Sequence, residues 1–290
     1  MDDVIRVVRR RLLRWYKKYQ RDLPWRHTRD PYTILVSEIM LQQTQVERVI
    51  PKYHAFLRAF PTVKVLANAK TADVIRMWKG LGYNRRALFL QRAAKVVCDE
   101  FSGVFPDTLK ELITLPGVGD YTARAVMSFA FEKKVPMMDT NHRRFYTRVY
   151  YGIKDVSDKD LLITAEEVFS KCRAYDWNQA LMDFGSTICL TRVPKCGICP
   201  LQEHCKAYPK ILTSKVFKKK KKKQSVRFKD TDRYYRGQIV DILRGEKRVL
   251  IHSLQSRFSD IDSIRFNEIV LKLAKDGLII KGRKYIKLPQ

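Results

Sequence analysis

Four cysteines in one short segment form the most chemically specific pattern in this 290-residue sequence. The ligand candidates Cys189, Cys196, Cys199 and Cys205 follow the spacing C-x6-C-x2-C-x5-C. Zinc modules usually present two close pairs of ligands separated by a dozen or more residues, whereas single ligands at short, unequal intervals suit wrapping around an iron-sulfur cubane. The spacing therefore predicts a 4Fe-4S cluster. A zinc site and four plain thiols are the alternatives.

Two acidic residues lie in or next to apolar segments, where a carboxylate is uncommon. Glu38 lies inside the apolar run from Ile34 to Leu41, and Asp139 follows the apolar segment VPMM. An unpaired buried charge is too costly to persist, so Glu38 must be paired, protonated or functional. A glutamate bonded to an arginine or to a backbone amide is the structural alternative, and acid chemistry is the functional one.

The turn LPGVG at residues 115–119 joins two helical patterns and precedes Asp139. A Gly-x-Gly turn that runs into a helix N-terminus presents backbone N–H groups without intrahelical partners, together with the positive end of the helix dipole. Gly117, Val118 and Gly119 could therefore clamp a phosphate. Taken alone, the glycines could equally serve only to join two helices at a tight turn.

The charge of the chain indicates a polyanionic partner. Lys and Arg number 58 against 30 Asp and Glu, which leaves +28 at pH 7. Such a surface binds phosphates and releases their counterions, so nucleic acid is the expected partner and an anionic membrane surface the alternative. The sequence contains no run of 18 apolar residues, and arginines interrupt the N-terminal helix pattern, so we expect no signal peptide and a cytoplasmic protein.

Helical periodicity predicts an all-α protein up to the cysteines, with a small mixed tail after them. A helix at 2–19 precedes one helix that runs from Pro31 through Tyr53. Further helices are expected at 52–60, 63–69, 71–79, 84–101, 121–131, 140–150, 157–171 and 176–188. A Lys-rich linker at 213–230, with six lysines at 218–223, leads to residues 231–290. There the order of helices at 234–244, 250–257 and 264–275 followed by a β-hairpin resembles a winged helix.

Several motifs in a fixed order resemble the helix-hairpin-helix glycosylase superfamily that includes endonuclease III, and more closely the adenine DNA glycosylases of MutY type. They are RDLPWR (21–26), PYTILVSEIMLQQTQV (31–46), GLGYNRRA (80–87), LPGVGDYTARAV (115–126), DTNHRRF (139–145), NQALMDFGSTIC (178–189) and the cysteine loop. The resemblance implies a two-lobed core at 1–212. A six-helix lobe spans about 29–134, and a second lobe combines 1–28 with 135–212, including the iron-sulfur loop 189–205.

The resemblance also implies roles for individual residues. Glu38 would protonate a flipped adenine and Asp139 would stabilise the sugar cation, with Asn141 helping to hold the water. Tyr121 stands where the lyases of the superfamily carry a Schiff-base lysine, which implies a monofunctional glycosylase. Trp25, Arg26 and Asp183 would line the adenine pocket. The residues expected to contact DNA are Gln43, Thr44, Leu81, Tyr83, Gly117, Val118 and Gly119.

The implied substrate is double-stranded DNA with adenine opposite 8-oxoguanine or guanine, bound by a nucleoid-associated monomer. Many adenine glycosylases carry a Nudix-like domain that reads 8-oxoguanine, whereas the basic tail here resembles the shorter winged-helix-like tail of some members, so the resemblance does not imply which residues would prefer 8-oxoguanine over guanine. Thymine mismatch glycosylases share Glu, Tyr and Asp at the same places, so thymine or uracil excision opposite guanine is one alternative. A non-catalytic iron-sulfur DNA-binding protein is the other, although such a protein needs neither carboxylate.

Overall fold

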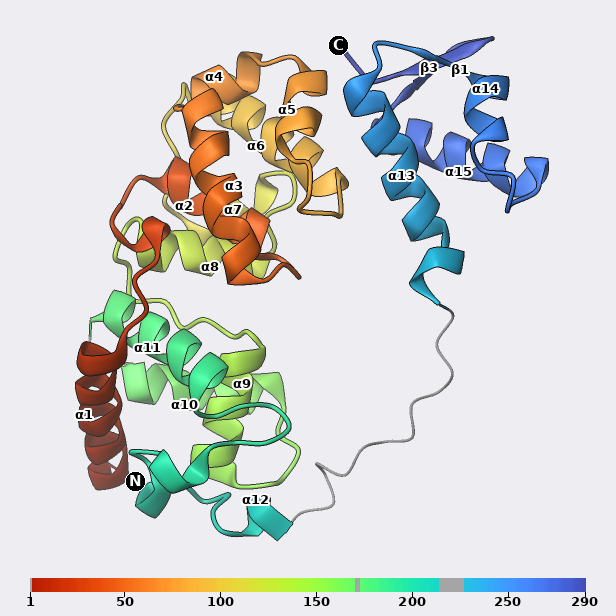
Figure 1. The fold of residues 1–290 in the computed structure, drawn as a ribbon. Coiled ribbons are helices and arrows are strands. Elements are labelled where there is room, and N and C mark those ends of the chain that lie inside the picture. The colour runs from red at the N-terminus through yellow and green to blue at the C-terminus, as the bar shows by residue number, and fades with distance from the viewer. Residues whose placement is uncertain (1, 170–172, 214–226) are drawn as a thin grey trace. The chain divides into compact units, whose positions relative to one another are not determined.

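The computed structural model describes residues 2–169, 173–213 and 227–290 (Figure 1). The chain is almost entirely helical up to residue 213, and a small three-stranded sheet follows near the C-terminus. This confirms the predicted all-α core with a small mixed tail. The lysines at 218–223 and most of the predicted linker lie outside the described residues. No helix of the described chain is long and apolar enough to cross a membrane.

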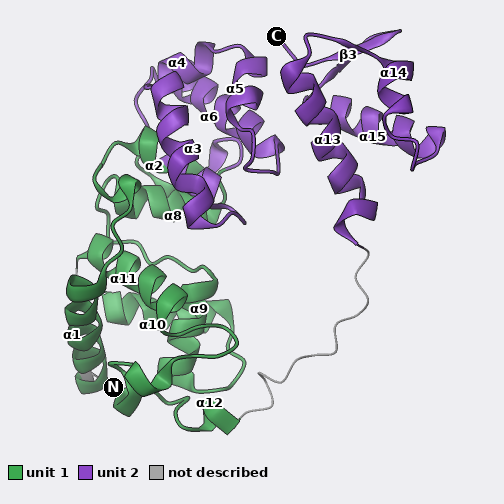
Figure 2. Ribbon diagram, in the orientation of Figure 1, with its two compact units in different colours: residues 1–34, 107–112, 118–221 green, residues 35–106, 113–117, 222–290 purple. Residues whose placement is uncertain are grey.

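The chain divides into two compact units (Figure 2), and each is described by itself. Unit 1 comprises residues 1–34, 107–112 and 118–221, and unit 2 comprises 35–106, 113–117 and 222–290. The C-terminal module, residues 227–290, thus groups with the helices of residues 35–106. The domain boundaries expected from the sequence remain a prediction.

Unit 1 is a helical bundle around one apolar core. Its complete helices are α1 (Asp2–Tyr19), α8 (Asp120–Phe129), α9 (Thr140–Tyr146), α10 (Asp158–Phe169), α11 (Ala174–Thr187) and α12 (Lys210–Thr213). The apolar face of α1, with Val8 and Leu12 fully buried, packs against α11, while its arginines stay at the surface. The aromatic rings of Phe145, Trp177 and Phe184 fill the centre of this core. Because α1 and the helices after residue 139 share this apolar core, they belong to one compact unit.

Unit 2 contains α3 (Val46–Ala59), α4 (Val63–Asn68), α5 (Thr71–Met77) and α6 (Arg85–Glu100). Two further helices, α2 (Pro31–Leu41) and α7 (Leu109–Thr114), begin in unit 1 and end in unit 2. The prediction of one helix from Pro31 through Tyr53 is wrong, because α2 ends at Leu41 and α3 starts at Val46. Gln43 in the intervening turn has φ 55°, a left-handed conformation that a helix cannot contain.

The C-terminal module has the element order expected of a winged helix. Helices α13 (Asp232–Gly245), α14 (Ile251–Ser256) and α15 (Ser263–Lys275) agree with the predicted ranges. Strands β1 (Val249–Leu250), β2 (Ile280–Lys281) and β3 (Tyr285–Lys287) form an antiparallel sheet in the order β1-β3-β2. Helix α13 packs on α5, and the apolar core of the module includes Ile75 and Leu88 of the preceding helices.

Candidate active site

Asp139 is the N-cap residue of α9 and lies in a dense set of hydrogen bonds. Its Oδ1 accepts from the backbone N–H groups of Asn141 and His142, each at 2.8 Å, and its Oδ2 accepts from Asn141 Nδ2 at 3.0 Å. Burial alone would raise the pKa of Asp139. The hydrogen bond and attraction of the His142 ring, followed by the two backbone N–H groups, outweigh burial and hold this pKa below its usual range. The site therefore holds Asp139 as a carboxylate.

The ring of His142 is the partner of Asp139 that sequence reasoning missed. His142 is fully buried, and its Nδ1 lies 2.6 Å from Asp139 Oδ1. Its Nε2 is buried without a hydrogen-bond partner among the described residues. The motif DTNH indicates this contact, because a side chain three residues after an N-cap residue faces that residue. The bond places His142 behind the carboxylate as a positioning residue.

We expect His142→Phe to shift the acid limb of the excision pH profile upward by about one to two pH units. The substitution fills the same buried volume but removes one hydrogen bond to a charged group, a loss of about 1.5–3 kcal/mol. The pKa of Asp139 then rises, so the carboxylate is lost at a higher pH than in the wild type. Single-turnover rates across pH measure the shift. A uniform fall of the rate at every pH would indicate only structural damage.

Asn141 connects Asp139 to the rest of unit 1. Arg144 Nη2 donates to Asn141 Oδ1 at 2.6 Å, and Asn141 Nδ2 lies 3.9 Å from Met182 Sδ. Gly185 on α11 leaves room for this side chain, because a Cβ at position 185 would come within 2.6 Å of Asn141 Cβ. The amide of Asn141 is thus fixed from three sides.

Tyr121 lies on α8 close to the same group of residues. Its hydroxyl donates to Met182 Sδ at 3.9 Å, so Tyr121 and Asn141 contact one methionine from two sides. Tyr121 is thus linked through Met182 to Asn141, which binds Asp139, and its role in place of a Schiff-base lysine stays a prediction.

Glu38 lies on α2 with 7% of its surface exposed, between fully buried apolar residues such as Val36 and Met40. Its burial agrees with the apolar run seen in the sequence.

In the LPGVG turn, the backbone conformation at position 117 requires a glycine. Gly117 has φ +80°, and a Cβ there would lie 2.7 Å from Phe89 Cβ. Val118 is buried, and Gly119 is the N-cap residue of α8 with no side-chain cap. The first N–H groups of α8 therefore lack a capping side chain, as a phosphate clamp requires.

The residues expected to enter DNA are organised by Arg86, a second residue that sequence reasoning missed. Its Nη1 donates to the backbone oxygens of Ile39, Met40 and Gln42 at 2.6–2.9 Å. Its Nη2 donates to Thr44 Oγ1 and Leu81 O, each at 3.0 Å, and to Gly82 O at 3.2 Å. Burial lowers the pKa of Arg86 to about 10. The buried guanidinium of Arg86 thus binds the last backbone oxygens of α2. It also connects the turn of Gln43 and Thr44 to the turn of Leu81 and Tyr83.

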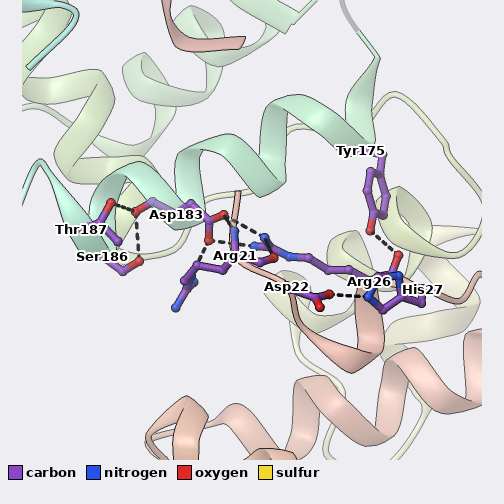
Figure 3. A network of polar contacts seen from close by, with 8 residues as sticks. All are labelled: Arg21, Asp22, Arg26, His27, Tyr175, Asp183, Ser186 and Thr187. Carbon is purple, nitrogen blue, oxygen red and sulfur yellow. Dashed lines mark hydrogen bonds and ion pairs between the residues drawn. The ribbon is translucent and has the colours of Figure 1, made fainter. Parts of the chain in front are cut away.

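The predicted base-pocket residues form a buried ion network (Figure 3). Asp183 on α11 is fully buried and receives Arg26 Nη1 and Nη2 at 2.8 Å each and Arg21 Nε at 2.6 Å. Burial acts to raise the pKa of Asp183, but the bonds from Arg26 and Arg21 keep it below its usual range. Trp25, which belongs to the same segment, is buried. The network anchors residues 21–26, and their contact with a base stays a prediction.

The four loop cysteines line one pocket together with the apolar side chains of Phe184, Ile188 and Leu201. Buried Arg148 places Nη1 3.3 Å from Cys189 Sγ and binds the backbone oxygens of Leu190 and Thr191. Burial raises the pKa of Cys199 to about 12, and the neighbouring cysteines add to the rise. Among the described residues, no three Cys, His, Asp or Glu side chains are arranged to hold a single metal ion. A pocket lined by four cysteines beside a guanidinium has the chemistry of a site for an anionic cluster.

Known proteins similar to this chain agree with one another. The family model described as HhH-GPD superfamily base excision DNA repair protein matches residues 36–171. Adenine DNA glycosylase of Mycolicibacterium smegmatis is 42% identical over 240 residues, covering 80% of this chain and 79% of that protein. The enzyme of the same name from Buchnera aphidicola (strain Bp) is 36% identical over 276 residues, covering 93% of this chain and 78% of that protein.

Two solved structures share the fold. A thermostable thymine-DNA glycosylase has a TM-score of 0.67 at 35% identity, covering 72% of this chain and 98% of that chain. A non-covalent endonuclease III-DNA complex has a TM-score of 0.63 at 22% identity, covering 74% and 99%. Because one of these structures is a thymine-DNA glycosylase, excision of thymine must be tested beside excision of adenine.

Proposed function

Because this chain belongs to the adenine DNA glycosylases of the HhH-GPD superfamily, we propose that it removes adenine paired with 8-oxoguanine or guanine by simple hydrolysis. The chain is a DNA N-glycosylase of base excision repair. The observation that carries the proposed mechanism is Asp139, held as a carboxylate by four hydrogen bonds.

The proposed reaction divides between two carboxyl groups. Glu38 donates its proton to a ring nitrogen of the extruded adenine, and the electrons of the breaking N-glycosidic bond leave with the base. The carboxylate of Asp139 stabilises the positive charge that develops on the sugar. Water then adds to the sugar carbon and gives its proton to solvent or to a carboxylate, so the products are free adenine and an abasic site. Asn141, fixed by Arg144, keeps Asp139 oriented.

Base extrusion requires contacts with the DNA on both sides of the flipped nucleotide. Gly117, Val118 and Gly119 are proposed to bind a phosphate next to it, since the first turn of α8 has no side-chain cap. Gln43, Thr44, Leu81 and Tyr83 are proposed to fill the gap in the duplex, because extrusion costs a few kcal/mol that inserted side chains offset. Trp25, Arg26 and Asp183 are proposed to border the adenine.

A duplex panel tests the function. Single-turnover rates are measured on otherwise identical duplexes that pair adenine with 8-oxoguanine, guanine or thymine, and thymine or uracil with guanine. We expect excision of adenine from the first two and slow or no excision elsewhere. Excision of thymine alone would overturn the adenine assignment, which the thymine-DNA glycosylase likeness makes a necessary control. Strand cleavage in the absence of added alkali would overturn the monofunctional mechanism.

We further propose that Cys189, Cys196, Cys199 and Cys205 hold a 4Fe-4S cluster. The cluster would supply a rigid anchor for the loop 189–205, through which Arg148 and Arg144 reach the oxygens of residues 189–191. Its role would be structural.

Aerobically purified protein is expected to be brown, to absorb near 400 nm and to contain about four irons per chain. Cys196→Ser is expected to lower the iron content and the melting temperature together, because the loop loses a ligand that crosslinks it. Cys98→Ser, which removes a cysteine on α6, is the matched control and should retain the iron. Colourless protein with one zinc per chain would contradict the assignment.

A further inference from the structure

The small sheet at one end of the C-terminal module carries a group of cations that no step of the proposed reaction uses (Figure 1). The inner side of the sheet contributes Val249 and Ile286 to the apolar core of the module. Six basic residues lie on the strands or directly beside them, and we call them the wing cations: Lys247, Arg248, Lys281, Arg283, Lys284 and Lys287. All are exposed except Lys287, which is half-buried.

The register of the strands decides which side chains share the outer face of the sheet. Leu250 is paired with Tyr285, and Ile280 is paired with Lys287. Cross-strand partners point to the same side of a sheet, and so do residues two positions apart on one strand. Tyr285 and Lys287 are two apart on β3, with the buried Ile286 between them. The outer face therefore combines apolar and aromatic side chains with a lysine.

The hairpin turn and the start of β1 add cations to this face. Gly282 N donates to Tyr285 O at 2.8 Å, and Ile251 N donates to Lys284 O at 3.0 Å, so the backbone of the turn is fixed. Arg248 Cζ lies 5.8 Å from the centre of the Tyr285 ring. Cations beside an aromatic ring suit the DNA backbone, in which charged phosphates alternate with less polar sugars.

The wing cations have no acidic neighbours in the sequence or in space. Residues 247–257 and 277–290 contain no Asp or Glu. Glu246, just before the first segment, is paired with Arg257 at 2.7 Å, and Asp276, just before the second, is paired with Arg85 at 3.5 Å. Within the described ranges, none of the wing cations forms an ion pair. Because positive charges without protein counterions repel one another, this surface favours a polyanionic ligand.

Helix α15 presents no such surface, although the last helix of a helix-turn-helix unit is usually the one that enters the major groove of DNA. Ile264 and Leu271 on its outer face are 72% and 56% exposed, and the acid Glu268 lies between them in the sequence. Lys272 is paired with Asp232 at 3.5 Å and with Glu268 at 3.6 Å. The sheet, rather than α15, is therefore the side of the module that suits a polyanion.

Duplex DNA fits the outer face of the sheet better than an anionic membrane does. Binding to a membrane surface depends on apolar side chains that enter the acyl layer. Leu250, Ile280 and Tyr285 are only 38–47% exposed, and they lie among cations. Side chains that are covered to this extent can pack against sugars while the wing cations bind phosphates.

We propose that the outer face of the sheet binds the backbone of duplex DNA outside the mismatch, independently of sequence and of damage. The wing cations contact phosphates, and Tyr285, Leu250 and Ile280 pack against the sugars. The contact raises the affinity for undamaged DNA, so the enzyme stays bound for longer while it searches. It takes no part in base extrusion or bond cleavage, and it does not depend on which base is excised.

The test measures the Kd of the full-length protein for an undamaged duplex over a range of salt concentrations. The double variant Arg283→Gln, Lys284→Gln is expected to lower the slope of log Kd against log salt by about two and to raise the Kd about tenfold at physiological salt. The matched control Lys272→Gln, Lys275→Gln removes the same charge from α15 and should keep the wild-type slope. The single-turnover rate of adenine excision at saturating enzyme should be the same in all three proteins.

Three outcomes would overturn the proposal. Equal losses of slope in the two double variants would show an effect of net charge rather than a contact surface. An unchanged slope and Kd in Arg283→Gln, Lys284→Gln would show that the sheet does not bind the duplex. Loss of binding to phosphatidylglycerol vesicles in this variant, with unchanged duplex binding, would assign the sheet to a membrane.

The undamaged duplex separates this proposal from the proposed function, because it contains no substrate. Wild-type protein that excises adenine but shows any of these three outcomes disproves only the role of the sheet. Wild-type protein that excises thymine instead of adenine, and whose double variant loses slope as expected, disproves only the adenine assignment.

Discussion

Asp139→Asn is expected to lower the single-turnover rate of adenine excision by about 10³-fold while duplex binding stays within about twofold of the wild type. The substitution removes the negative charge that stabilises the sugar cation and keeps the size of the side chain. Asparagine is as good an N-cap as aspartate, so α9 keeps its first N–H groups paired. Rapid quench measurements give the rate, and fluorescence anisotropy gives the affinity.

Asp155→Asn provides the matched control for Asp139→Asn. Asp155 is an exposed acid of the same unit, and its removal makes the same change in net charge. Both variants should melt within a few degrees of the wild type, since neither creates a cavity or breaks a cap. An excision rate in Asp139→Asn equal to that of Asp155→Asn would remove Asp139 from the mechanism.

The environment of Asp139 could be predicted from the sequence because its contacts are local. The N–H groups that bind it belong to residues two and three positions later, and a capping aspartate before a helical pattern implies such bonds. The same holds for the C-terminal module, where helical periodicity predicted the three helices nearly to the residue and the hairpin after them, although the short strand β1 was not predicted. Contacts between residues within one helical turn follow from the local sequence and can therefore be predicted from it.

The turn after α2 could not be predicted, because its cause is remote. LQQTQ has a composition that a helix tolerates, and the residue that ends the helix is Arg86, more than forty positions later. Arg85 and Arg86 look equivalent in GLGYNRRA, yet the side chain of Arg85 is 56% exposed and Arg86 is buried. Only tertiary packing distinguishes the arginine that binds backbone oxygens from the one at the surface.

Asp183 shows the same limit for a site residue. The resemblance implies a place at the base, which stays a prediction, and the structure adds that its carboxylate binds two arginines more than 150 positions earlier. A buried carboxylate with this many donors orients the loop that carries Trp25. Sequence position alone cannot distinguish a residue that touches a ligand from one that holds the residues around it.

Glu38→Gln is expected to lower the excision rate by at least about 10³-fold. Glutamine fits the same buried volume on α2 but has no acidic proton to give to the leaving base. The carboxylate of Asp139, whose pKa is held low, is present in both proteins, so the fall of the rate at low pH should be the same in Glu38→Gln as in the wild type.

Glu47→Gln on α3 is the control, because it removes an exposed carboxylate from the next helix. It should retain the wild-type rate. The acid limb of the pH profile also separates the two carboxylates: His142→Phe moves this limb to higher pH, whereas Glu38→Gln lowers the rate and leaves the limb in place. A rate of Glu38→Gln equal to that of Glu47→Gln would place the proton donor elsewhere, because glutamine has no acidic proton to give to the base.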